Sequence, residues 1–182
     1  MSAIFVFANV SVDGYVEGPE GDISWAHADS EPFAREQGRL VEAVLFGRRT
    51  YELMREFWPT DQARQIAPET ARFLNEKPKY VASHSAFEPE WAGATVFHED
   101  AIAQIRELKA RTAGRIAMLG SNTLAASLLD AGLLDELHVM VNPVVLGAGM
   151  PLLRGLRARA EVRLMSAEPQ GSGAVLLKYA RT

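Results

Sequence analysis

The chain has 182 residues, of which 48% are hydrophobic and 23% charged. These proportions suit a folded globular protein and exclude a disordered one. The 19 basic and 23 acidic side chains give a net charge of -4, so we expect no nucleic-acid partner. There is no cysteine, which excludes disulfides, thiolate metal sites and a cysteine nucleophile.

The length suits one domain, and no Pro/Ser-rich linker or repeat divides the sequence, so we predict a single domain over residues 1–182. The apolar run from Ile4 to Ala8 is far shorter than the roughly 18 residues of a membrane-spanning helix and lacks the flanks of a signal peptide. We therefore predict a cytoplasmic protein with no membrane partner.

The first half of the sequence alternates between strand and helix patterns. Residues 4–10 are β-branched and aromatic, which predicts a buried strand, and a glycine-containing loop follows the turn Asp13-Gly14. Residues 33–43 have a helical mix, and residues 43–46 form a short apolar run that ends at Gly47. Good helix formers then continue to Trp58-Pro59. The pattern is therefore strand, glycine turn and helix.

The second half repeats this unit and then changes. Strands are predicted at residues 79–83, 94–97 and 115–119, with helices at 101–110 and after Ser121-Asn122-Thr123 to near Gly132. Consecutive strands follow at 137–145, 161–166 and 174–179. We therefore predict an α/β fold with a mixed, mostly parallel sheet, an antiparallel C-terminal edge and helices on both faces.

The turn Gly47-Arg48-Arg49-Thr50 lies where a predicted strand meets a predicted helix. Ligands of open α/β sheets bind beyond the carboxyl ends of the strands, where helix N-termini offer free N–H groups and a partial positive charge. Two guanidinium groups can bind phosphate through paired hydrogen bonds, and a threonine adds a hydroxyl. This turn is therefore a candidate phosphate site.

The turn Gly120-Ser121-Asn122-Thr123 is a second candidate, because glycine lets a ligand approach the backbone closely and the small polar side chains add donors. Ordinary helix capping explains either turn equally well, so that alternative stays open. Two such turns on successive crossovers indicate a ligand with several phosphates, such as a dinucleotide. The sequence lacks both the three-glycine fingerprint of the Rossmann fold and the P-loop lysine motif.

Several motifs occur together in an order that resembles the dihydrofolate reductase-like family. Within that family the chain is most similar to the branch that contains the reductase domain of the bacterial riboflavin deaminase-reductase. The similarity covers residues 4–153. It rests on Ser11-Val12-Asp13-Gly14, the segment from Gly47 to Glu52, residues 79–83, Gly120-Ser121 with residues 133–137, and residues 143–147.

The resemblance implies a three-layer dihydrofolate reductase-like fold and a reductase that binds NADPH. It also implies contacts to the cofactor, with the first strand beside the nicotinamide, the two glycine turns at the phosphates and one segment along the adenosine 2'-phosphate. The residues so implied are Ala8 and Asn9; Gly47, Arg48, Arg49 and Thr50; Ser83 and His84; and Gly120, Ser121, Asn122, Thr123 and Leu124.

The substrate is less well defined by the resemblance. The riboflavin reductase typically has a lysine on its first strand, where this chain has Phe7. Dihydrofolate reductase has a carboxylate soon after a tryptophan, and here Trp25 is followed by Asp29 and Glu31 at a different spacing. We take Asp29 as the candidate proton relay, with a helix N-cap as its alternative role. Phe7, Trp25 and Glu31 are candidate substrate-binding residues.

These observations predict hydride transfer from NADPH to a small heterocycle that is pterin-like or aminopyrimidine-like. A narrower alternative is the 5-amino-6-(5-phosphoribosylamino)uracil reductase of riboflavin biosynthesis, and another is a non-catalytic dinucleotide-binding module. The four histidines have no metal-ligand spacing, so we expect no metal. Residues 135–146 are rich in leucine and β-branched residues, which predicts a contribution to a homodimer interface.

Overall fold

The computed structural model describes residues 2–26 and 30–182, except for the side chains of Ser30 and Glu31. The chain forms two compact units, each built from separate stretches of sequence. Unit 1 comprises Met1–Ile4 and Asp29–Ser121, and unit 2 comprises Phe5–Ala28 and Asn122–Thr182. The single domain over residues 1–182 stays a prediction.

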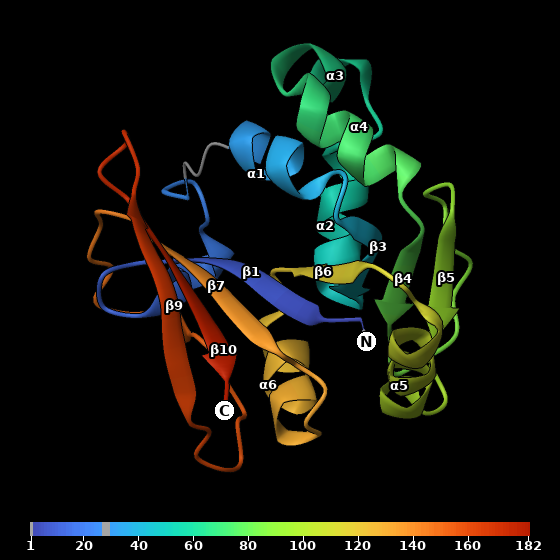
Figure 1. The fold of residues 1–182 in the computed structure, drawn as a ribbon. Coiled ribbons are helices and arrows are strands. Elements are labelled where there is room, and N and C mark those ends of the chain that lie inside the picture. The colour runs from blue at the N-terminus through green and yellow to red at the C-terminus, as the bar shows by residue number, and fades with distance from the viewer. Residues whose placement is uncertain (1, 27–29) are drawn as a thin grey trace. The chain divides into compact units, whose positions relative to one another are not determined.

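The strands of unit 1 lie in the order β5-β4-β3-β6 (Figure 1). Strand β3 (Val41–Gly47) pairs in parallel with β4 (Lys79–Ala82) on one side and with β6 (Arg115–Leu119) on the other, and β4 also pairs in parallel with β5 (Ala94–Phe97). The apolar run at the centre of β3 is fully buried, as expected of a strand covered on both faces.

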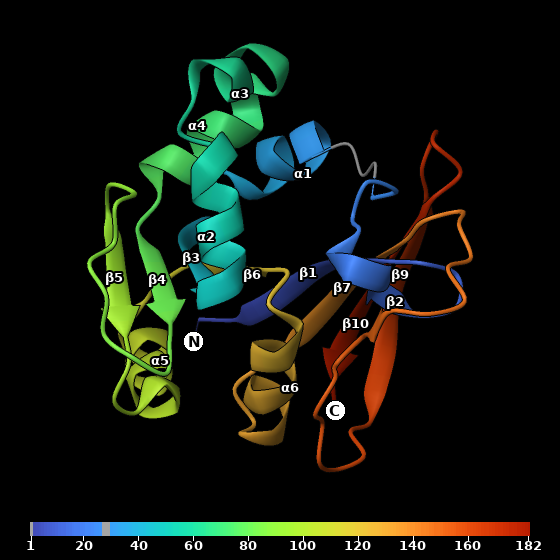
Figure 2. The ribbon, with the colours of Figure 1, turned by 180° about the vertical axis from the view of Figure 1, so that it is seen from behind.

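Unit 1 also contains five helices among its described residues. Figures 1 and 2 show α1, α3 and α4 gathered together, and α5 close to β4 and β5. The helices are α1 (Ser30–Gln37), α2 (Arg48–Phe57), α3 (Asp61–Ile66), α4 (Pro68–Glu76) and α5 (Ala101–Arg111).

Helix α1 is shorter than the helix predicted over residues 33–43, because it ends at Gln37 and β3 already begins at Val41. The amide of Gly38 donates to the carbonyl oxygen of Ala34 at 2.8 Å, and a Cβ at Gly38 would lie 2.7 Å from the same oxygen. Closure of the helix at this point therefore requires glycine.

Unit 2 combines parallel and antiparallel pairing in the strand order β1-β7-β10-β9. Strand β1 (Ile4–Val10) is parallel to β7 (Glu136–Val141), whereas β10 (Val175–Arg181) is antiparallel to both β7 and β9 (Val162–Pro169). The unit also contains η1 (Pro19–Gly21), α6 (Asn122–Asp130) and the small antiparallel pair of β2 (Tyr15–Glu17) and β8 (Met150–Pro151).

The predicted fold class, an α/β fold with a mixed, mostly parallel sheet and an antiparallel C-terminal edge, is confirmed. The long apolar segment over residues 135–146 includes strand β7, which ends at Val141 and lies between β1 and β10. The four central residues of β7 are buried, and the predicted contribution of the segment to a homodimer interface stays a prediction. Among the described residues, no helix is both long and apolar enough to cross a membrane.

A buried lysine lies at the start of β4. Lys79 is fully buried, and its Nζ donates to the carbonyl oxygens of Lys77 at 2.8 Å and Asn75 at 3.2 Å. The same Nζ lies 5.0 Å from the centre of the Trp91 ring, whose Nε1 donates to Oδ1 of Asn75 at 2.7 Å. Burial lowers the pKa of Lys79 from 10.5 to about 8, because an apolar environment disfavours the charged amine.

This pKa shift predicts an unusual pH dependence of stability. Between pH 8 and 10.5 the unfolded chain retains the Lys79 proton that the folded chain has lost, so the free energy of unfolding rises with pH by up to about 3 kcal/mol. Chemical denaturation at pH 7.5, 8.5, 9.5 and 10.5 measures the rise. Lys79→Met should remove it and Lys77→Met should retain it, whereas the same profile in both variants contradicts the assignment.

Candidate functional site

Three loops of unit 1 follow the carboxyl ends of adjacent parallel strands. Strand β3 is the central one, because Gly47 is in register with Ala82 of β4 and Leu45 with Met118 of β6. The carboxyl ends of parallel strands meet at one edge of a sheet, where ligands of α/β proteins bind. The loops that begin at Gly47, Ser83 and Gly120 therefore emerge from the same edge.

The two glycine turns predicted to bind phosphate are in direct contact. The amide of Gly47 donates to Oγ of Ser121 at 2.7 Å, and that hydroxyl donates to the carbonyl oxygen of Leu119 at 3.3 Å. A Cβ at Gly120 would lie 3.4 Å from Cγ2 of Thr50. Both turns therefore lie side by side within unit 1, as binding of a single ligand with several phosphates would require.

The backbone of the second turn is in the left-handed region. Gly120 has a φ of +57° and Ser121 a φ of +58°. Glycine adopts this conformation freely, whereas for serine it is uncommon and costs about 1 kcal/mol. The hydrogen bond from Gly47 to the Ser121 hydroxyl offsets part of that cost.

Helix α2 begins with a positively charged first turn. Its N-cap is Gly47, which makes no side-chain cap hydrogen bond, and the next two residues are Arg48 and Arg49, both exposed. The positive end of the helix dipole and two guanidinium groups therefore coincide at the junction with β3, an arrangement that favours an anion. Thr50, half-buried, follows in the same turn.

Among the described residues, the guanidinium of Arg48 contacts Glu52, Ser85 and Phe87. Its Nε donates to Oε1 of Glu52 at 2.8 Å, one turn along α2, and its Nη1 donates to Oγ of Ser85 at 3.0 Å. The ring of Phe87 lies against it, with 4.6 Å between Cζ and the ring centre. These contacts join the first turn of α2 to the loop after β4.

That loop is folded around Ser83, which is buried. The Ser83 hydroxyl donates to the carbonyl oxygen of Ser85 at 2.7 Å and accepts from the Ser85 amide at 3.2 Å. His84 lies between these two serines and is exposed. The Ser83 side chain therefore shapes the loop, while Ser85, which was not predicted from the sequence, contacts Arg48.

The predicted nicotinamide contacts lie on β1 in unit 2. Ala8 is buried, and Oδ1 of Asn9 accepts from Nδ2 of Asn142 at 3.1 Å. Asn142 is itself buried, and its Nδ2 also donates to the carbonyl oxygen of Met140 at 3.0 Å. The sequence reasoning missed Asn142, which it placed inside the strand predicted over residues 137–145.

The other predicted residues at the second turn begin α6 in unit 2. The side chain of Asn122 is used internally, because its Nδ2 donates to the carbonyl oxygen of Pro151 at 2.6 Å and its Oδ1 accepts from the Leu153 amide. Thr123 is exposed and Leu124 half-buried. A role for Asn122 in ligand binding would thus depend on its backbone.

The candidate substrate residues are described only in part. Phe7 is half-buried and packs against the cluster of Met140, Ala174 and Leu176 in unit 2. Trp25 is half-buried, and its Nε1 donates to the carbonyl oxygen of Asp22 at 3.0 Å. Asp29 lies outside the described residues, and Glu31 belongs to α1 without a described side chain. Their predicted roles stay predictions.

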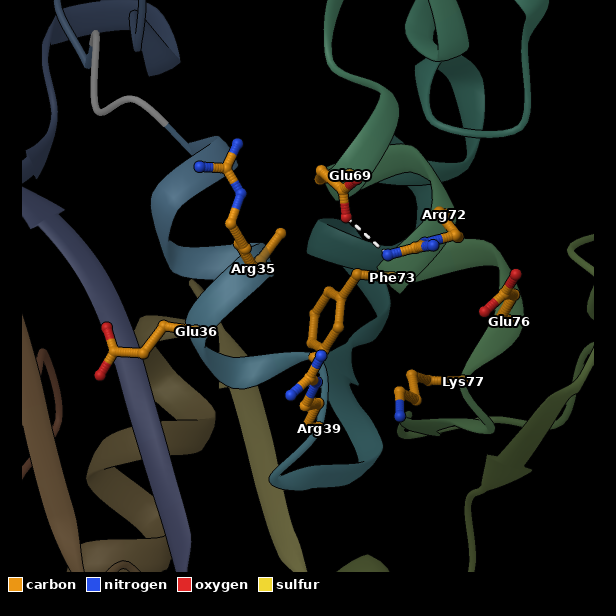
Figure 3. A pocket seen from close by; sticks show the side chains of 10 residues that line it. Arg35, Glu36, Arg39, Glu69, Arg72, Phe73, Glu76 and Lys77 are labelled. Carbon is orange, nitrogen blue, oxygen red and sulfur yellow. Dashed lines mark hydrogen bonds and ion pairs between the residues drawn. The ribbon is translucent and has the colours of Figure 1, made fainter.

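A hollow of about 530 Å³ lies between α1 and α4 in unit 1 (Figure 3). It is lined mainly by charged side chains, including Arg35, Arg39 and Lys77, and Arg72 is paired with Glu69 at 2.6 Å. Arg35 lies in the last turn of α1 and Lys77 caps α4, where cations complement helix dipoles.

Among the described residues, no cluster of three or more His, Asp or Glu side chains could hold a metal.

Comparison with solved structures defines the fold class of this protein. Dihydrofolate reductase from Enterococcus faecalis, solved in complex with NADP(H) and RAB-propyl, superimposes with a TM-score of 0.70 over 99% of this chain and 96% of its own, at 15% identity. A Shewanella sp. PV-4 protein named for riboflavin biosynthesis gives a TM-score of 0.79 over 99% of both chains at 21% identity. The fold is therefore dihydrofolate reductase-like.

The family follows from the sequence itself. The model of the RibD C-terminal domain matches residues 2–176, so the chain belongs to that family. The uncharacterized protein YyaP of Bacillus subtilis (strain 168) is 25% identical over 170 residues, which cover 93% of this chain and 90% of YyaP. The resemblance noted from the motifs is thus confirmed, and the match extends beyond Leu153.

The contact between the turns can be tested through Ser121. Ser121→Ala removes the acceptor of the Gly47 amide, so we expect the free energy of unfolding to fall by about 1 kcal/mol. Ser121→Gly loses the same acceptor but adopts the positive φ without strain, so its loss should be smaller. Urea denaturation measures both.

The control is Ser127→Ala, which removes an exposed hydroxyl that bonds within α6 and should change stability by less than about 0.5 kcal/mol. Equal stability of Ser121→Ala and the unmodified protein would show that the hydrogen bond from Gly47 to Ser121 contributes nothing to stability.

Proposed function

We propose that this protein is an NADPH-dependent reductase that transfers hydride to a small heterocycle, either pterin-like or aminopyrimidine-like. One observation carries the proposal, namely that the two glycine turns contact each other beside Arg48 at the carboxyl edge of three parallel strands. Membership of the RibD C-terminal family and a structural neighbour solved with NADP(H) support it.

The residues of unit 1 fit the phosphates of such a cofactor. The first turn of α2 offers backbone amides and the guanidinium groups of Arg48 and Arg49, which suit the pyrophosphate and the adenosine 2'-phosphate. Gly120 has no side chain to keep a ligand from the backbone. The hydroxyls of Ser83 and Ser121 are used internally, so binding would depend mainly on amides and arginines.

NADPH supplies the hydride in such a reaction, and the protein must hold the substrate and deliver a proton. Asp29 is our proposed proton relay, with Phe7, Trp25 and Glu31 as proposed substrate contacts and Ala8 and Asn9 as proposed contacts of the nicotinamide. A carboxyl group in a partly apolar site is suited to proton transfer near neutral pH.

The proposal predicts that the protein binds NADPH more tightly than NADH. Because a guanidinium–phosphate contact is charge-assisted, Arg48→Ala should weaken NADPH binding about 10- to 100-fold and leave NADH binding nearly unchanged. Titration followed by NADPH fluorescence measures both. The control is Arg72→Ala, which removes another helix-surface arginine that is paired with a glutamate and should bind both cofactors normally.

Turnover separates the enzyme from a non-catalytic binding module. NADPH oxidation is followed with dihydropterins, aminopyrimidines and the phosphoribosylated aminouracil as substrates, and Asp29→Asn should reduce any turnover found. Equal, weak binding of NADPH and NADH would contradict the NADPH proposal. Tight NADPH binding without turnover of any substrate would instead favour the module.

We also propose that the protein is a homodimer, and that its interface includes β9. This strand pairs with β10 at the end of the sheet order. It exposes Val162, Leu164 and Met165, whose exposed fractions are 39%, 50% and 41%. An edge strand with exposed apolar side chains favours pairing with another chain.

Two substitutions distinguish a dimer interface at β9 from one at residues 135–146. A charge placed in an apolar interface is strongly unfavourable, so Leu164→Glu should shift the mass measured by light scattering from a dimer to a monomer. Val145→Glu, at an exposed position of residues 135–146, should leave a dimer. A monomeric unmodified protein, or a dimeric Leu164→Glu variant, would rule out this interface.

A further inference from the structure

The contacts of Arg48 leave one part of its guanidinium available. An arginine has five N–H donors, and among the described residues two of these are used, one from Nε to Glu52 and one from Nη1 to Ser85. The side chain is 42% exposed. Both hydrogens of Nη2 and one of Nη1 therefore lack an acceptor within the described chain. Together these two nitrogens form the edge that binds two oxygens of a phosphate.

The face of the guanidinium is fixed by an aromatic ring. Phe87 lies 4.6 Å from Cζ of Arg48 and packs on Tyr51 with 5.7 Å between ring centres. Tyr51 is buried, and its hydroxyl accepts from the amide of Trp91 at 2.9 Å. Phe87 therefore packs between Arg48 and an aromatic cluster that is anchored in the core.

Glu52 acts on Arg48 in two ways. Its carboxylate holds the Nε edge at 2.8 Å, which directs the opposite edge away from α2. It also places a negative charge beside the site where an anion would bind. A glutamine at this position can accept the same hydrogen bond without the charge, so the two effects are separable by mutation.

We infer that Glu52, Ser85 and Phe87 are positioning residues that orient Arg48 toward a phosphate monoester, and that Glu52 also limits how tightly this group binds. The inference rests on the proposed function, in which that group is the 2'-phosphate, the one feature by which NADPH differs from NADH. These residues therefore set the preference between the two cofactors through Arg48.

The test measures the dissociation constants of NADPH, NADH and adenosine 2',5'-bisphosphate for the unmodified protein and three variants. Phe87→Leu, which keeps an apolar side chain but no aromatic face, should weaken NADPH and the bisphosphate about two- to fivefold. Glu52→Ala should weaken them by a similar factor. Glu52→Gln should tighten them, most strongly at low salt. NADH binding should stay constant throughout.

Matched controls separate positioning from general effects. Glu56→Gln removes the same charge one turn further along α2, from an exposed position, and Phe57→Leu removes another half-buried ring of that helix. Neither should change the ratio of the NADPH and NADH constants by more than about twofold.

The outcomes distinguish failure of the proposed function from failure of the positioning roles of Glu52, Ser85 and Phe87. If the unmodified protein binds neither cofactor, or binds both equally, the proposed function fails and the inference fails with it. If NADPH is preferred but Phe87→Leu and both Glu52 variants leave the preference unchanged, the proposed function stands and the inference is overturned. Parallel losses of NADPH and NADH binding would also overturn it, because they indicate a purely structural role.

Discussion

Parallel pairing of β3 with β4 and β6 is the constraint on which the candidate site depends. It aligns Gly47 with Ala82 and Leu45 with Met118, so three loops that are far apart in sequence emerge from one edge of unit 1. The hydrogen bond from the Gly47 amide to Ser121 then joins two of them. A slip of one residue in either pairing would reverse the faces of the strand and separate the loops.

Polar side chains at this edge mostly stabilise the loops. The hydroxyl of Ser121 bridges Gly47 and Leu119, and that of Ser83 bonds twice to Ser85. Such local bonds fix the backbone in a defined conformation before any ligand arrives, which lowers the entropic cost of binding. In the proposed function, backbone amides and the arginines that begin α2 recognise the anion.

The sequence predicted the features that depend on local signals. Apolar runs that end at glycine located β3 and β6, the motif order identified the family, and the helix after Arg48 ends before Pro59 as expected. Other features depend on which segments become neighbours. The contacts of Arg48 with Ser85 and Phe87 join residues more than thirty positions apart in sequence, and no pattern within either segment predicts them.

The same dependence on contacts between distant segments explains where the structure differs from the sequence-based predictions. The apolar character of residues 135–146 does not reveal that β7 is paired on both sides, which only the structure shows. The close approach of Gly38 to Ala34 shortens α1, although the residues that follow it continue a helical pattern. Nothing in the composition of residues 61–76 had suggested two separate helices, α3 and α4.

The most direct test of the central claim is a titration of the isotope-labelled protein with adenosine 2',5'-bisphosphate and then NADPH, followed through the backbone amide signals of Gly47, Ser85 and Ser121. Because the proposal places all three loops in one binding site, we predict that all three signals shift along a single saturation curve for NADPH. Shifts confined to one loop, or three curves with different midpoints, would contradict a common binding site at the edge of β4, β3 and β6.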